Sequence, residues 1–255
     1  MFHSLAHRAG LAIAHFLSRE VERGPLSAPP DFDELRATLR PGDILLVEGR
    51  ARVSGSVKYL TQSTWSHAAL CVGPVAGRTE LDGEPHVLVE ALLAHGVVSS
   101  PLSKYRASHT RICRPQRLTG QDLRTLVAFA VASIGYAYDL RNILDLLRYL
   151  APLPHIPVHL RRRLIAAGAA SPTRAICSTL IAEAFHTIRY PILPTVERLE
   201  AEAEGTAAQQ HALREIMHIR DSSLFTPRDF DISPYFEIVK PALVCGFDYR
   251  RLDWR

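Results

Sequence analysis

The sequence predicts an α+β protein in which a small antiparallel sheet packs against one helix that begins with a cysteine. Short apolar runs, bounded by Gly, Pro and polar residues, recur between residues 41 and 114, as strands do. The segments that join these runs are too short for helical crossovers, so the strands are expected to pair antiparallel. The segment 177–190 carries apolar residues at the spacing of a single buried helical stripe. A chain of 255 residues can bury a substantial core, so one large domain is expected.

The strands of this sheet follow one another closely along the chain. A Pro-Gly turn at residues 41–42 leads into the first strand. Pleating of the second strand places His67 on one face among small apolar residues, and Glu90 lies inside the third strand. The strands are expected over residues 41–47, 66–73, 86–92, 96–99 and 110–114, with two later strands over 235–240 and 242–247.

The helix expected over residues 177–190 has a thiol in its first turn. Its buried stripe includes Leu180 and Ile181, and counting back one turn places Cys177 on the same stripe, while Pro191 stops the helix. Unpaired N–H groups and the positive end of the helix dipole lie at this position, and both lower the pKa of a thiol. The ordinary alternative is that Cys177 is a small buried hydrophobe, as free cysteines often are.

Further helices are expected on both sides of the central segment. A capping-box pattern at Thr119 opens one of them, and Gly135 closes it. Thr226-Pro227 marks another helix start. The segment 195–220, which is rich in Glu, Ala and Gln, is expected to be helical with a solvated face. Shorter helices are expected over residues 33–39, 57–62 and 140–150.

Composition argues against several classes of protein. The net charge of +4 is small for this length, so no nucleic-acid partner is expected. The four cysteines are widely spaced, and three of them lie in runs that resemble buried strands, which favours free thiols over a disulfide framework. The sequence contains no P-loop, dinucleotide fingerprint or H-E-x-x-H motif, and the pair His155 and His159 lacks a third ligand. Neither a metal nor a cofactor is therefore expected.

The chain divides into an N-terminal segment, residues 1–40, and a domain over residues 41–255. Residues 2–17 form one apolar helical face that polar residues interrupt, and no signal-peptide cleavage site follows. This amphipathic helix is expected to dock on the domain, and contact of residues 1–24 with a membrane surface is the alternative. No apolar run reaches the roughly 18 residues of a membrane span, so a cytoplasmic protein, at most peripheral to a membrane, is expected.

Three polar residues stand in otherwise apolar elements: Cys177, His67 and Glu90. A buried carboxylate needs a partner, and a hairpin of the second and third strands would bring His67 near Glu90. With the helix packed on the sheet, a thiol, an imidazole and a carboxylate could meet, as nucleophilic catalysis requires, and helix-start N–H groups could hold an oxyanion. Taken singly, His67 could be an ordinary core residue, and Glu90 could pair with an arginine.

Short motifs around these residues recur in a definite order between residues 40 and 240. They are Pro41-Gly42-Asp43-Ile44, Trp65-Ser66-His67-Ala68, Val89-Glu90-Ala91, Gly135-Tyr136-Ala137-Tyr138-Asp139, Cys177-Ser178-Thr179-Leu180, and Thr226-Pro227 with Ser233-Pro234-Tyr235-Phe236. In order and spacing they resemble the circularly permuted papain-fold cysteine hydrolases, an NlpC-related family often called YiiX/YebB-like. The resemblance implies a permuted papain-like fold, with a small antiparallel sheet or half-barrel packed against the cysteine helix. It also implies a triad of Cys177 as nucleophile, His67 as base and Glu90 as the third residue.

The resemblance further implies a substrate cleft lined by Tyr138, with Ser66 and Ser178 of the matching motifs as further substrate-binding residues. Residues 140–172, rich in Arg and Pro, exceed a minimal member of the family and are interpreted as an insertion that could form a lid. The expected function is a cysteine hydrolase that cleaves an amide (peptide, cell-wall or lipid-linked) or an ester through a Cys thioester. The alternatives are a thiol-dependent acyltransferase acting on lipids at a membrane surface and a catalytically inactive binding module.

Overall fold

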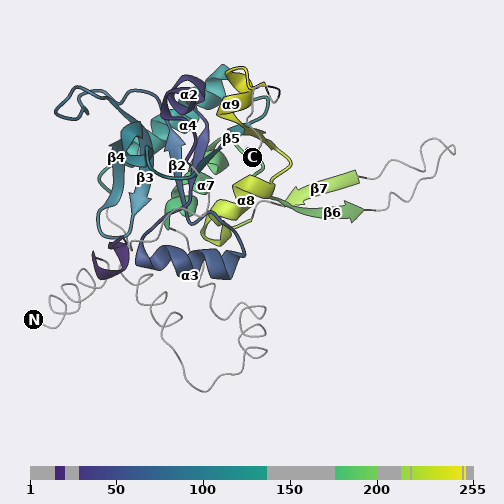
Figure 1. Ribbon diagram of the computed structural model, residues 1–255. Coiled ribbons are helices and arrows are strands. Elements are labelled where there is room, and N and C mark those ends of the chain that lie inside the picture. The colour runs from purple at the N-terminus through teal and green to yellow at the C-terminus, as the bar shows by residue number, and fades with distance from the viewer. Residues whose placement is uncertain are drawn as a thin grey trace, which may run out of the picture.

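The centre of the molecule is a six-stranded antiparallel open sheet with the strand order β4-β3-β2-β1-β5-β8 (Figure 1). The structure, a computed structural model, describes residues 15–20, 29–136, 176–199, 214–218, 220–248 and 250. Helices pack against the sheet, which confirms the predicted α+β class. The strands span Ile44–Val47 (β1), His67–Cys71 (β2), His86–Leu92 (β3), Gly96–Pro101 (β4), Thr110–Pro115 (β5) and Phe236–Val239 (β8).

Some of the helices begin at capping residues that the sequence provides. The Asp31 side chain accepts hydrogen bonds from the N–H groups of Asp33 and Glu34, and Thr226 forms a capping box with Asp229. The α-helices span Phe32–Thr38 (α2), Arg52–Thr61 (α3), Gly120–Ala132 (α4), Ile176–Thr187 (α7), Pro227–Ile232 (α8) and Pro241–Val244 (α9), and the 3₁₀ turns span Leu102–Tyr105 (η1) and Ser222–Leu224 (η2).

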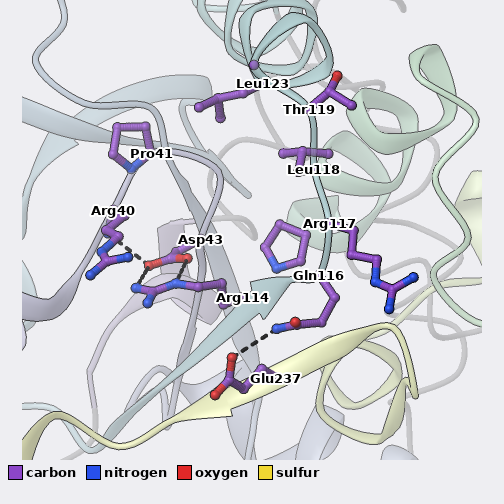
Figure 2. Close-up of a pocket in the computed structure, with 12 residues that line it drawn as sticks. Arg40, Pro41, Asp43, Arg114, Gln116, Arg117, Leu118, Thr119, Leu123 and Glu237 are labelled. Atoms are coloured by element: carbon purple, nitrogen blue, oxygen red, sulfur yellow. Dashed lines mark hydrogen bonds and ion pairs between the residues drawn. The ribbon is translucent and has the colours of Figure 1, made fainter. Parts of the chain in front are cut away.

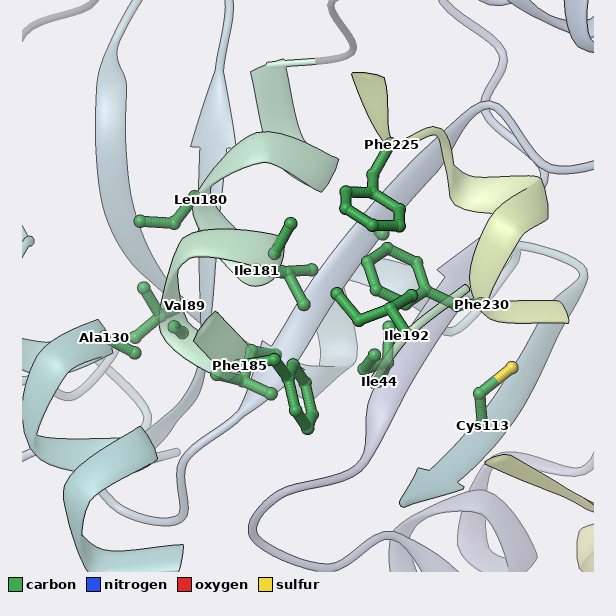
Figure 3. Close-up of a cluster of buried hydrophobic side chains, with 14 of the residues drawn as sticks. Ile44, Val89, Cys113, Ala130, Leu180, Ile181, Phe185, Ile192, Phe225 and Phe230 are labelled. Carbon is green, nitrogen blue, oxygen red and sulfur yellow. The ribbon is translucent and has the colours of Figure 1, made fainter. Parts of the chain in front are cut away.

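Alternate residues of the sheet build two apolar cores, one on each face. Helices α7 and α4 pack on one face, where Phe185 and Ile181 of α7 and Ala130 of α4 lie among Val89 and Ile44 of the strands (Figure 3). Helix α2 and the turn η1 cover the other face with a second cluster. Its members are Phe32, Leu35, Leu45, Val47, Ala69, Cys71, Leu88, Leu102, Tyr105, Ile112 and Val239. The helix with the thiol therefore packs on the sheet, as predicted.

A buried ion pair fixes the turn into β1. Asp43 is 1% exposed, and its carboxylate accepts two hydrogen bonds from the Arg114 guanidinium of β5, at 2.8 Å from Nε and 2.7 Å from Nη2 (Figure 2). Gly42 has a φ of +91°, and a Cβ atom there would stand 2.9 Å from Leu123 Cδ1. Glycine is the residue that meets both demands of this turn.

Replacing Thr119 by alanine is expected to lower the free energy of unfolding by about 1 kcal/mol. The Thr119 hydroxyl accepts a hydrogen bond from the Asp122 N–H at the start of α4, at 3.1 Å, and alanine leaves that N–H without it. Urea denaturation followed by circular dichroism measures the loss. Thr125→Ala, inside the same helix, is the matched control and should cost less because alanine has the higher helix propensity. An equal loss in both variants would contradict the capping role.

The prediction of a helix over residues 195–220 is wrong. Two antiparallel strands, β6 (Thr195–Leu199) and β7 (Arg214–His218), form a separate two-stranded sheet (Figure 1). The Ala-, Glu- and Gln-rich composition that suggested a helix comes from residues 200–213, outside the described residues. Averaging over the whole window hid the β-branched residues Thr195, Val196 and Ile216 at its ends.

The strand predicted over residues 242–247 is also wrong. Pro241 opens the short helix α9, because proline is favoured in the first turn, where its missing N–H leaves no bond unmade. Cys245 follows this helix and is exposed rather than buried in a strand. Two other boundaries moved: α3 begins at Arg52, before the expected 57, and α7 ends at Thr187, before the expected 190, with Arg189 in a left-handed turn (φ +53°).

Only the end of the predicted N-terminal amphipathic helix is described. There Leu17 is 9% exposed, Glu20 forms a bridge with Ala51, and the Arg52 guanidinium lies 4.2 Å from the centre of the Phe16 ring. This end of the helix therefore contacts the domain. The rest of residues 1–24, the segment 140–172 and Tyr138 lie outside the described residues. In the part of the chain that the structure describes, no helix is long and apolar enough to cross a membrane.

Candidate active site

Cys177 lies in the first turn of α7, which begins at Ile176. The apolar stripe of α7, with Leu180, Ile181 and Phe185, packs against β2 and β3, so the start of the helix is held over this part of the sheet. The Cys177 side chain is buried, at 5% exposed. The packing that buries the stripe thus fixes the position of the thiol.

The His67 ring lies between the thiol and a carboxylate. His67 is the first residue of β2, and its Nε2 lies 2.7 Å from Oε2 of Glu90 in β3. The ring also interacts with the Cys177 side chain, and each of the two groups shifts the pKa of the other. With Nε2 on Glu90, Nδ1 is the ring nitrogen left for the thiol. The structure therefore brings together Cys177, His67 and Glu90, three residues that are far apart in the sequence.

The pairing of β2 with β3 ends beside Cys177. The paired register of β2 and β3 joins Leu70 to Val89 and Cys71 to Leu88, and it does not extend to Ala68. The Ala68 N–H instead interacts with the Cys177 sulfur and helps to lower the pKa of the thiol. A strand amide that would otherwise continue the β2–β3 ladder therefore interacts with the Cys177 sulfur.

Glu90 is fully buried, and each of its oxygens has a donor. Lys104 Nζ lies 2.6 Å from Oε1, and the Tyr105 hydroxyl donates to Oε2 at 2.6 Å. The expectation that a buried Glu90 needs a partner is thus met by lysine, tyrosine and histidine, and not by arginine. Sequence reasoning missed Lys104 and Tyr105. The signal available was a Lys-Tyr pair just after β4, the strand that pairs with β3.

The electrostatics of the three residues favour a charged pair. Burial lowers the pKa of His67, but the Cys177 thiolate and the Glu90 carboxylate outweigh it and raise that pKa to about 10. Burial raises the pKa of Cys177, yet the His67 imidazolium, the Ala68 N–H and the neighbouring Ser178 hydroxyl hold it below its ordinary value. Burial likewise opposes the Glu90 carboxylate, and His67 and Lys104 hold its pKa well below the usual range. The site therefore favours a thiolate beside an imidazolium.

Two further residues predicted at the site, Ser66 and Ser178, are the chain neighbours of His67 and Cys177, whereas Tyr138 lies outside the described residues. Ser178 is fully buried, and its Oγ stands 4.0 Å from the Cys177 sulfur, so the contact it makes is with the thiol. Ser66 is 8% exposed, and its Oγ accepts a hydrogen bond from the Gly49 N–H at 3.0 Å.

A second buried glutamate resembles Glu90 but serves a different part of the fold. Glu48 is 4% exposed, and its carboxylate lies 2.9 Å from Lys58 Nζ and 3.2 Å from His109 Nδ1. The His109 ring stacks on Trp65, with the ring centres 5.0 Å apart. This lysine–glutamate–histidine cluster contains no thiol and ties α3 to the end of β1, so it is a natural comparison for the first.

The cavity of Figure 2 lies away from these residues. It measures about 430 Å³, and the Asp43–Arg114 ion pair forms part of its wall. None of Cys177, His67 and Glu90 lines it. Among the described residues, no group of three or more His, Cys, Asp or Glu side chains is placed to hold a metal ion.

Comparison with known proteins adds a loose structural likeness. No protein-family model matches the sequence. Among solved structures, the fold is similar to the crystal structure of the metalloprotein yiiX from Escherichia coli O157:H7, with a TM-score of 0.44 and 15% sequence identity, over 79% of this chain and 96% of that one. With a TM-score this low the two folds are only loosely alike, and the word metalloprotein describes the E. coli protein alone.

Proposed function

We propose that this protein is a cysteine hydrolase with a Cys177-His67-Glu90 triad and the permuted papain-like architecture that its motifs resemble. One observation carries the proposal: the His67 ring lies between the Cys177 thiol, whose pKa it lowers, and the buried Glu90 carboxylate, whose Oε2 is 2.7 Å from its Nε2. In this arrangement the carboxylate orients the ring. The ring can then donate a proton to the leaving group of the substrate and later accept one from water.

The proposed reaction has two halves. The Cys177 thiolate attacks the carbonyl carbon of an amide or ester, and N–H groups at the start of α7 stabilise the oxyanion. The His67 imidazolium then gives its proton to the leaving amine or alcohol, and a thioester remains on the sulfur. In the second half, neutral His67 takes a proton from water as the water attacks the thioester. The carboxylic acid leaves, and the thiolate and imidazolium are restored.

The proposed substrate is a peptide or another acyl amide or ester. The triad sets the reaction type, because a thiolate with a proton-donating imidazolium suits a poor leaving group such as an amine. A cell-wall peptide and a lipid-linked amide both satisfy this chemistry. Tyr138, Ser66 and Ser178 stay proposed substrate contacts by family resemblance, and segment 140–172 stays a proposed lid.

Alkylation of Cys177 by iodoacetamide is expected to begin at a lower pH than alkylation of glutathione in the same tube. The His67 imidazolium stabilises the thiolate over the pH range between the lowered pKa of Cys177 and the pKa of His67, about 10. The thiolate therefore persists at pH values below the pKa of an ordinary thiol. Mass spectrometry of the Cys177 peptide, from pH 4 to pH 10, measures the rate. The background is Cys245→Ala, which removes the exposed thiol.

The acid limb of alkylation is the pH range over which the rate at Cys177 rises. His67→Asn is expected to move this limb to higher pH, because burial then raises the pKa of Cys177 without an imidazolium to oppose it. The matched control is His109→Asn, which removes the histidine of the Glu48 cluster. A Cys177 limb that coincides with that of glutathione in the unsubstituted protein would overturn the proposed function.

A further inference from the structure

We propose that Lys104 is a positioning residue of the triad: its ammonium keeps Glu90 ionised and in place while His67 exchanges its proton. The inference deepens the proposed function and rests on it. Lys104 Nζ lies 2.6 Å from Glu90 Oε1, whereas His67 Nε2 lies 2.7 Å from Oε2. The two cationic partners therefore occupy opposite oxygens of one carboxylate.

The carboxylate is fixed at both ends. Tyr105, next to Lys104 in η1, donates its hydroxyl to the oxygen that His67 uses, at 2.6 Å. Tyr105 is 7% exposed and belongs to the second apolar core, so η1 is anchored. The Ser103 N–H of the same turn donates to Glu84 at 3.1 Å. The anchored turn η1 thus presents two donors, Lys104 and Tyr105, to Glu90. They hold Glu90 Oε2, which accepts from His67 Nε2–H, in one orientation.

The charge on the site changes during the proposed reaction, and Lys104 keeps a positive charge beside Glu90 throughout. While His67 is an imidazolium, Glu90 has a cation on each oxygen. After His67 gives its proton to the leaving group, Lys104 is the cation that remains, among the described residues, in an ion pair with the fully buried carboxylate. A buried carboxylate without a cation takes up a proton, and the nearest one would be on His67 Nε2. Lys104 opposes this transfer and keeps His67 in the tautomer that accepts a proton at Nδ1.

The groups that face Glu90 come from three elements. His67 belongs to β2, Lys104 and Tyr105 belong to η1, and Cys177 of α7 lies beyond the ring. Lys104 itself also borders an open cavity of about 390 Å³ whose wall includes Glu80, Asp82 and Glu84. With 34% of its side chain exposed, Lys104 can be replaced without burying a new group in the core.

The test is the acid limb of Cys177 alkylation, measured in Cys245→Ala protein with Lys104→Met, Lys104→Gln or Lys104→Arg. Loss of the ammonium lets Glu90 take up a proton, which weakens the His67 imidazolium and so raises the pKa of Cys177. The limb should therefore move upward, by about one pH unit in the Met and Gln variants. Lys104→Arg keeps the charge and should restore the limb.

Lys58→Met is the matched control, because Lys58 pairs with buried Glu48 as Lys104 pairs with Glu90. It should weaken the fold by a similar amount and leave the limb where it is. The proposal is overturned if the limb stays unshifted in the Lys104 variants, or if Lys58→Met moves it as far. A failure of the proposed function is distinct, because it shows in the unsubstituted protein as a Cys177 limb no lower than that of glutathione.

Discussion

Cys177→Ala is expected to reduce the acylation and turnover of an activated ester, such as p-nitrophenyl acetate, by a factor on the order of 10⁴. The variant removes the atom that is proposed to form the thioester. The exposed Cys245 follows α9, and its sulfur lies 3.9 Å from the Thr38 hydroxyl of α2. Release of p-nitrophenol measures turnover. Mass spectrometry of the intact protein detects the acetyl group, which should be found on Cys177 in the unsubstituted protein.

The same variant has a readout that does not depend on substrate. The Cys177 thiolate is one of the groups that raise the pKa of His67 to about 10, so its removal should lower that pKa. Titration of the His67 ring by NMR measures this shift. Cys245→Ala is the control and should change neither the acylation nor the titration. A Cys177→Ala protein that is still acetylated at the original rate would place the nucleophile elsewhere.

The parts of the fold that local pattern determines could be predicted from the sequence. Strands β2 and β3 are mostly apolar runs that His67 and Glu90 interrupt, and α7 follows from the spacing of its apolar stripe. The expected packing of the helix on the strands brings α7 to the sheet. It does not by itself bring Cys177 to His67 and Glu90, because the strand alternation places these two with the second core, on the face opposite α7.

The remaining features depend on contacts that no local pattern encodes. Lys104 and Tyr105 reach Glu90 because β4 runs back along β3, and η1 then covers the face of the sheet on which the Glu90 side chain lies. A Lys-Tyr pair in a polar connection has the same composition whether it meets a buried carboxylate or water. The Ala68 amide is a similar case, since it depends on where the β2–β3 register ends. The strands β6 and β7 were missed because composition was averaged across the connection between them.

Glu90→Ala is expected to lower the free energy of unfolding by about 3 kcal/mol at pH 7 and to slow ester acylation at the same time. It leaves Lys104, Tyr105 and His67 without their shared acceptor. The estimate is at the low end for a broken buried ion pair because the Lys104 side chain is 34% exposed, and water recovers part of the loss. Urea denaturation measures stability, and p-nitrophenol release measures acylation.

The loss from Glu90→Ala should depend on pH in one direction. The pKa of Glu90 is lowered in the folded protein from an ordinary 4.5, so its carboxylate stabilises the fold fully above about pH 4.5 and progressively less as the pH falls below that value. The difference in unfolding free energy between the two proteins should therefore shrink from pH 6 to pH 3. Glu48→Ala is the matched control: it removes a buried carboxylate with its own lysine and histidine, and should cost stability while acylation continues. If Glu90→Ala and Glu48→Ala slow acylation equally, the effect is one of folding, and Glu90 has no special role beside His67.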